Sequence, residues 1–143
     1  MSEQLAKREH SPFQEIVHLL RNEDFPYYAG WKFVEKRDGQ MCYCAMAFLA
    51  KKKGISDWKL RLHFIGNVLE KYGFSKEELI KERMCTVEGC KYPATLEFLI
   101  MHLNVKHRLP PKKIADYVEK IENDTRKLPP WWKKLYYEWK FSA

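Results

Sequence analysis

Two cysteines and two histidines in the second half of the chain constrain its fold more than any other feature. Four residues separate Cys85 from Cys90, eleven separate Cys90 from His102, and four separate His102 from His107. Thiolates and imidazoles hold tetrahedral zinc in proteins, and this order and spacing are close to those of a two-cysteine, two-histidine site. The sequence therefore predicts a Zn²⁺ ion bound by Cys85, Cys90, His102 and His107.

The local residues fit such a site. The segment between the cysteines contains Gly89, which can adopt the backbone conformation that a tight turn requires. His102 and His107 are five residues apart, so the helix that carries them must tighten or loosen in its last turn to bring both rings to one ion. The alternative is two buried thiols and two unrelated histidines, which must then fall in this order by coincidence.

The segment 84–107 resembles the Cys2His2 zinc fingers. Leu99 stands three residues before His102, where a finger has its helix leucine, and Tyr92 is suited to the hairpin aromatic position. The resemblance implies a small ββα unit, with the cysteines on a hairpin and the histidines on the helix that follows.

The helix of this unit lacks the side chains that read bases. The positions that contact bases in DNA-reading fingers correspond to Thr95, Glu97, Phe98 and Met101, and none is Arg, Lys, Asn or Gln. Apolar residues instead surround the helix nearly completely, which is typical of a buried helix. We therefore expect the finger to pack into the rest of the chain, either as a structural core or beside a nucleic-acid contact.

Length and composition predict a single compact α+β domain, mainly α-helical with the small ββα finger embedded in it. The 143 residues are 45% hydrophobic and 31% charged, which allows a core and argues against a membrane protein. We divide the chain into a helical region with a short β segment near 31–35 (residues 1–83), the finger (84–109) and a basic helix with an aromatic tail (110–143), packed as one unit. Neither a signal peptide nor a spanning segment is evident, and a cytoplasmic location is expected.

Periodicity and capping signals place the other elements. A helix is expected to begin at Pro12 with Ser11 as its cap, and another at Pro110-Pro111. Further helices are predicted over 41–53, 58–72 and 76–83, the last opened by a capping box of Ser75 and Glu78. A strand is predicted over 31–35, followed by a turn at 37–40.

Charge points to a polyanionic partner. The net charge is +7, and the residues from 106 onward supply ten basic and five acidic side chains. Candidate nucleic-acid contacts are Lys106, Arg108, Lys112 and Lys113 beside the finger, and Trp131, Trp132, Lys133 and Lys134 in the tail. The aromatic tail has two other interpretations, which are docking onto the body or a partner protein and contact with a membrane surface.

Two further stretches each allow two interpretations. Cys42 and Cys44 are either buried structural thiols or, with His18 or His63, half of a second metal site. The lysines of 51–53, with Lys59 and Arg61, form either a second phosphate-binding patch or a solvated helix end.

Catalysis is not expected. Zinc with four protein ligands has no open position for water, and no phosphate-binding loop, nucleophile elbow or H-E-x-x-H motif is present. We predict a non-enzymatic, zinc-binding regulatory protein whose partner is nucleic acid, DNA rather than RNA, with no membrane and no small-molecule substrate. The alternative is a protein-interaction factor that targets a host complex and uses zinc only structurally.

A second resemblance concerns the origin of the chain. The runs 41–49 and 102–119 are similar to small uncharacterised proteins of phages and archaeal viruses. This resemblance implies a viral or mobile-element origin and brings no activity with it.

Overall fold

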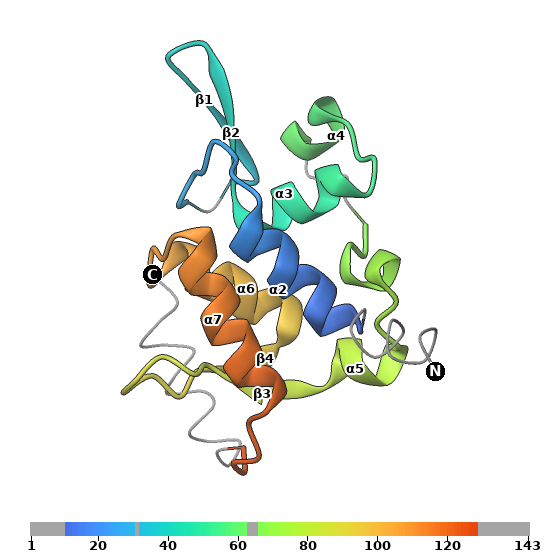
Figure 1. Ribbon diagram of the computed structural model, residues 1–143, viewed down its shortest axis with the longest axis vertical. Coiled ribbons are helices and arrows are strands. Elements are labelled where there is room, and N and C mark those ends of the chain that lie inside the picture. The colour runs from blue at the N-terminus through green and yellow to red at the C-terminus, as the bar shows by residue number, and fades with distance from the viewer. Residues whose placement is uncertain (1–10, 31, 63–65, 129–143) are drawn as a thin grey trace.

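The computed structural model describes residues 11–30, 32–62 and 66–128 of the chain. The fold is α+β, as predicted, and combines helices with two small antiparallel hairpins (Figure 1). The described elements are α2 (Pro12–Asn22), β1 (Val34–Arg37), β2 (Gln40–Tyr43), α3 (Ala45–Lys52), α4 (Asp57–Arg61), η1 (Leu69–Tyr72), α5 (Lys76–Ile80), β3 (Glu82–Met84), β4 (Pro93–Thr95), α6 (Leu96–Val105) and α7 (Pro111–Glu122).

Three helices organise the core. α2 lies along α7, and α6 packs against both α7 and α3 (Figure 1). Their apolar faces meet in one buried cluster that also includes residues of α3 and of both hairpins. Ile16 of α2, Leu103 of α6 and Ile114 of α7 are completely buried in it. α2 and α7 are thus held against the ββα segment by a shared hydrophobic core.

The helix starts at Pro12 and near Pro110-Pro111 are confirmed. The Oγ of Ser11 accepts a hydrogen bond from the amide of Gln14 at 3.3 Å, and Pro12 occupies the first helical position. α7 begins with Pro111 after Pro110 as its cap. Proline suits these positions because its ring fixes φ near the helical value and its missing N–H has no partner in the first turn.

The helix predicted over 41–53 is wrong in its first part. Met41 to Tyr43 lie in β2, which pairs with β1, and α3 begins only at Ala45. Asp38 and Gly39 form the connection between the strands with φ values of 50° and 80°, the left-handed backbone conformation that two-residue hairpin turns favour. The Sγ of Cys44 then accepts the amide of Ala47 at 3.4 Å and caps α3. The strand expected at 31–35 begins at Val34.

The helices predicted over 58–72 and 76–83 are both shorter than expected. α4 ends at Arg61, and the next helix that the structure describes is η1. The cap at Ser75 is confirmed, because its Oγ accepts the amide of Glu78 at 3.2 Å. The Glu78 carboxylate pairs with Arg83, however, and α5 ends at Ile80 so that the chain can enter β3.

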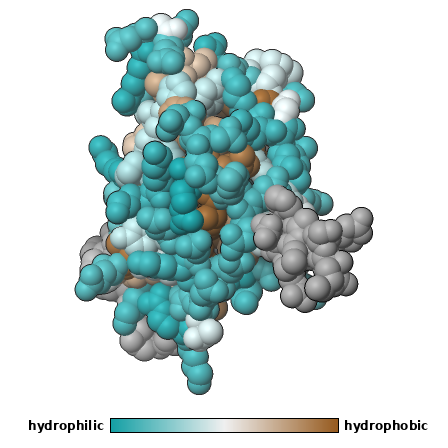
Figure 2. All heavy atoms as spheres, viewed as in Figure 1, coloured by the Kyte–Doolittle hydropathy of each residue, from teal (hydrophilic) through white to brown (hydrophobic). Residues whose placement is uncertain are grey.

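The exterior is mostly polar. Figure 2 shows a face covered mainly by hydrophilic side chains, with hydrophobic ones visible in small separate areas. Within the residues described, no helix has the length and apolar character that crossing a membrane requires.

Candidate metal centre

The two cysteines lie on the connection of the β3–β4 hairpin. The strands pair antiparallel, with Met84 opposite Pro93. Beyond that pair, the amide of Cys85 donates to the carbonyl of Tyr92 at 2.8 Å, and the amide of Cys90 donates to the carbonyl of Val87 at 3.0 Å. Gly89 has φ of 81°, a conformation that a residue with a Cβ rarely adopts. The turn folds back on itself and brings both sulfurs to one side.

The two histidines reach the sulfurs from α6 and from the turn after it: His102 lies in the helix, and His107 follows its cap residue Lys106. This helix begins directly after β4, so its first turns lie against the hairpin. His102 is 6% exposed, and its ring stacks on Tyr92 with centroids 4.5 Å apart. The amide of His107 donates to the carbonyl of His102 at 3.3 Å, five residues back. The chain therefore makes one wider turn as it leaves the helix, which brings the second ring beside the first.

The distances between the four ligand atoms fit one tetrahedral metal ion. They all lie within 4.8 Å of one another. Cys85 Sγ is 3.6 Å from His107 Nε2, Cys90 Sγ is 3.3 Å from His102 Nε2, and the two Nε2 atoms are 3.1 Å apart. A tetrahedral ion with bonds of about 2.3 Å to sulfur and about 2.0 Å to nitrogen places sulfur and nitrogen about 3.5 Å apart and two nitrogens about 3.3 Å apart. The predicted ligands thus form a buried cluster that can bind a metal.

The electrostatics of the cluster favour a thiolate at Cys90 and oppose a second one at Cys85. Hydrogen bonds from Cys85 and from both imidazoles lower the pKa of the Cys90 thiol to about 3. The same hydrogen bond, together with burial, raises the pKa of the Cys85 thiol, because two adjacent thiolates repel each other. A divalent cation removes this repulsion, so metal binding and loss of the second proton are expected to occur together.

The cluster is attached to the body of the protein. Thr86 Oγ1 donates to the carbonyl of Tyr117 in α7 at 2.8 Å, and Arg126 donates to the carbonyl of Cys85 at 3.4 Å. Most of the apolar residues of α6 are buried, as the sequence predicted. Met101 and Val105 are half-buried, and Phe98 is 60% exposed on the outer side of the helix.

Asn104 is a structural residue that the sequence did not indicate. It is 2% exposed, and its Oδ1 accepts hydrogen bonds from the amide of Ala45 at 3.0 Å and the hydroxyl of Tyr27 at 2.9 Å. Its Nδ2 donates to the carbonyls of Tyr28 and Gly30 at 3.4 and 3.2 Å. One side-chain amide on α6, the helix that carries His102, therefore fixes the segment that leads to the β1–β2 hairpin and the start of α3.

The cations predicted beside the finger surround the α6–α7 turn. Lys106 caps the end of α6, Arg108 is exposed in the turn with φ of 48°, and Lys112 and Lys113 are exposed on the first turn of α7. Lys112 Nζ lies 4.0 Å from Asp24. The tail candidates Trp131, Trp132, Lys133 and Lys134 lie outside the described residues.

Cys42 and Cys44 occupy structural positions. Both are buried, Cys44 caps α3, and burial raises its pKa to about 11. His18 contacts Asn22 on the exposed side of α2, and His63 lies outside the described residues. The interpretation as buried thiols agrees with these contacts.

No protein-family model, curated protein or solved structure matches this chain. The similarity to small proteins of phages and archaeal viruses stays a prediction.

Proposed function

We propose that Cys85, Cys90, His102 and His107 form a structural Zn²⁺ site of the Cys2His2 type. Two thiolates and two imidazoles in tetrahedral arrangement are a donor set that selects zinc. All four positions belong to the protein, so the ion would serve to hold the β3–β4 hairpin against α6. The ligand distances are the observation that carries this proposal.

We further propose that the protein binds nucleic acid, with DNA preferred, as a non-enzymatic regulatory factor of viral or mobile-element origin acting in the cytoplasm. Lys106, Arg108, Lys112 and Lys113 follow directly on the metal ligand helix, and a fixed α6–α7 turn would present them together to phosphates. The outer residues of α6 include Glu97, Phe98 and Met101, which offer no side chain for bidentate base contacts. Binding would therefore depend on phosphates and tolerate many sequences.

One observation favours the second candidate, a protein-interaction factor that targets a host complex. The Phe98 ring is mostly exposed on the outer face of α6, with Met101 half-buried beside it on the helix surface. Exposed aromatic residues are frequent anchors of protein interfaces.

A salt titration distinguishes the two candidates. Duplex DNA, single-stranded DNA and RNA would each be titrated with the protein at salt concentrations from about 50 to about 200 mM. The triple substitution Lys106→Ala, Lys112→Ala and Lys113→Ala should weaken binding and reduce the salt slope by about two to three units. Phe98→Ala and Lys71→Ala, both at exposed positions, should leave binding unchanged. A wild-type protein that binds none of these probes at low salt contradicts the nucleic-acid proposal.

A further inference from the structure

A second basic surface lies at the end of the molecule formed by the β1–β2 hairpin and α4, away from the metal centre. We call it the hairpin-end surface, and it consists of the exposed residues Lys32, Lys36, Arg37, Trp58, Lys59 and Arg61. Residues 31–62 contain eight basic and three acidic side chains. α4 packs beside β1, and both extend from the body at the same end (Figure 1).

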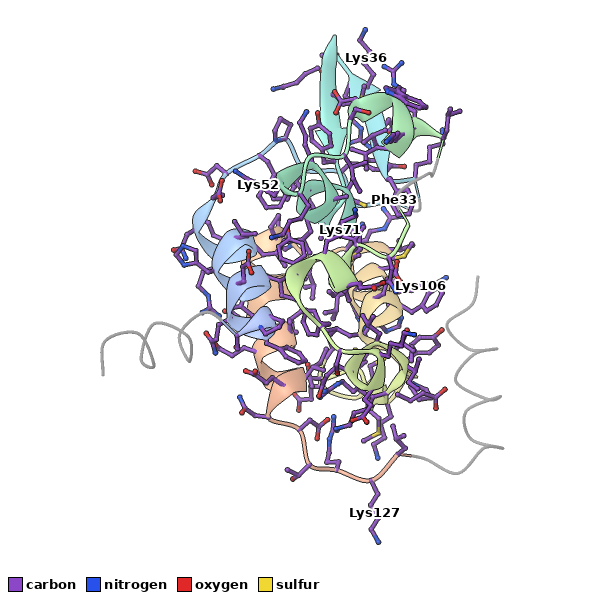
Figure 3. All side chains as sticks on the ribbon, turned by 90° about the vertical axis from the view of Figure 1, so that its right-hand side faces the viewer. Phe33, Lys36, Lys52, Lys71, Lys106 and Lys127 are labelled. Carbon is purple, nitrogen blue, oxygen red and sulfur yellow. The ribbon has the colours of Figure 1, made fainter. Side chains whose placement is uncertain are left out.

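Three of these cations are available to an anionic partner. Lys51 pairs with Asp57 at 3.0 Å and Arg37 with Glu35 at 2.9 Å, and Lys52 and Lys53 pair with carboxylates near α2. Among the residues that the structure describes, no carboxylate lies within ion-pair distance of Lys36, Lys59 or Arg61. Figure 3 shows Lys36 on the hairpin at the extreme end of the molecule, with Lys127 at the opposite end.

An exposed tryptophan lies among these cations. Trp58 is 58% exposed, and the Nζ of Lys59 lies 5.7 Å from the centroid of its ring. A large aromatic side chain on a surface helix is normally turned inward, and the buried residue of α4 is Leu60 instead. The exposed ring offers a flat face on which a base can stack, with ammonium and guanidinium groups beside it for the phosphates.

The helix that carries this tryptophan is attached to the rest of the protein. The carboxylate of Asp57, the residue before it, accepts hydrogen bonds from Tyr43 of β2 and Lys51 of α3, both at 3.0 Å. α4 is therefore attached to the hairpin and to α3 at its first residue. The backbone at Trp58 therefore needs little rearrangement when a ligand binds.

We propose that the hairpin-end surface binds single-stranded nucleic acid, with Trp58 as the stacking residue and Lys36, Lys59 and Arg61 as phosphate contacts. The proposal rests on the proposed nucleic-acid function and adds a second contact surface and a preference for unpaired bases. In a duplex the bases are already stacked on one another, so the Trp58 ring can contribute only to single strands. Charge complementarity and the exposed ring together select this partner over an acidic protein.

The test measures binding of a fluorescent oligothymidine and of a duplex of the same length to the full chain. Trp58→Ala should weaken oligothymidine binding about five- to 150-fold and change duplex binding less than about twofold. Trp58→Phe, which keeps an aromatic face, should restore most of the affinity. Leu62→Ala is the matched control, because Leu62 is 57% exposed on the end of the same helix and has no aromatic ring. Thermal unfolding midpoints of all variants should remain equal to that of the wild type.

A second experiment tests the proposed phosphate contacts of the hairpin-end surface. The double substitution Lys59→Ala and Arg61→Ala should weaken oligothymidine binding and reduce its salt slope by about one unit or more, whereas Lys71→Ala should not.

If the Lys106, Lys112 and Lys113 triple variant loses affinity while Trp58→Ala binds single strands like the wild type, this inference is overturned and the proposed function stands. Equal losses from Trp58→Ala and Leu62→Ala, or equal losses on single strands and duplex, overturn it as well. A wild-type protein that binds no probe at low salt overturns both.

Discussion

The two β-hairpins that the structure describes are the same kind of element and are held by different means. The β1–β2 hairpin is closed by the two residues Asp38 and Gly39 and needs no other group at its turn. The β3–β4 hairpin has strands of three residues and a long connection that carries Cys85 and Cys90. Short strands alone give little stability, so we expect the second hairpin to depend on the four side chains of the candidate metal centre. The first hairpin is closed by its backbone turn, and we expect the second to be closed by metal binding.

Removing a metal ligand is expected to have the largest effect. Cys85→Ala should abolish metal binding and lower the free energy of unfolding by more than about 3 kcal/mol, because the metal is bound only by the folded chain. Cys42→Ala is the matched control, since it removes another buried thiol from the first hairpin. It should keep one metal per chain and cost about 1 kcal/mol. Metal analysis and chemical denaturation measure both results, and equal losses from the two variants would contradict the difference between the hairpins.

Asn104 connects the two regions, and its replacement should have the next largest effect. Asn104→Ala leaves the amide of Ala45 and the carbonyls of Tyr28 and Gly30 without their side-chain partner. We expect a loss of about 2 to 4 kcal/mol in the free energy of unfolding, with the metal content unchanged. Hydrogen exchange should show faster exchange at the Ala45 amide. An unchanged unfolding curve would mean that water replaces the hydrogen bonds of the Asn104 side chain with no loss in the free energy of unfolding.

The sequence predicted the metal centre better than the elements around the first hairpin. Ligand spacing is a local property, and it identified all four residues of the cluster. The run Met41 to Tyr43 is apolar and short, and such a run suits a strand or a buried helix equally well. Asn104 could not be identified, because its partners Tyr27, Tyr28, Gly30 and Ala45 are 59 to 77 residues away along the chain. Contacts of this kind follow from packing and have no local pattern.

Two glycines allow a direct comparison of the hairpin turns. Gly39 has φ of 80° and Gly89 has φ of 81°, and an added Cβ would meet no atom within 4 Å at either position. Gly39→Ala and Gly89→Ala should therefore each cost about 1 kcal/mol, through backbone strain alone. Only Gly89→Ala should also weaken metal binding, by about fivefold, because it disturbs the turn that holds both sulfurs. Competition with a chelator measures this affinity, and a similar decrease for Gly39→Ala would show that the two turns are coupled.

The ion pair between Lys51 and Asp57 should give the smallest effect. Hydrogen bonding from Lys51 lowers the pKa of the Asp57 carboxyl below its usual value. The stabilisation is therefore present above the unfolded pKa of about 3.9 and is lost as the pH falls through the lower folded value. Asp57→Asn should cost less than about 1 kcal/mol at pH 7, because solvent screens this half-exposed pair. The difference in the free energy of unfolding between Asp57→Asn and the wild type should disappear near pH 2. A difference that persists there would exclude this ion pair as its cause.

Metal analysis of the purified protein, followed by replacement of the ion with Co²⁺, tests the central claim most directly. The account predicts one zinc per chain, a cobalt spectrum of tetrahedral type with thiolate charge-transfer bands, and a lower unfolding midpoint after a chelator removes the ion. A protein that contains no metal, binds no Co²⁺ and unfolds at the same temperature with and without the chelator would contradict it.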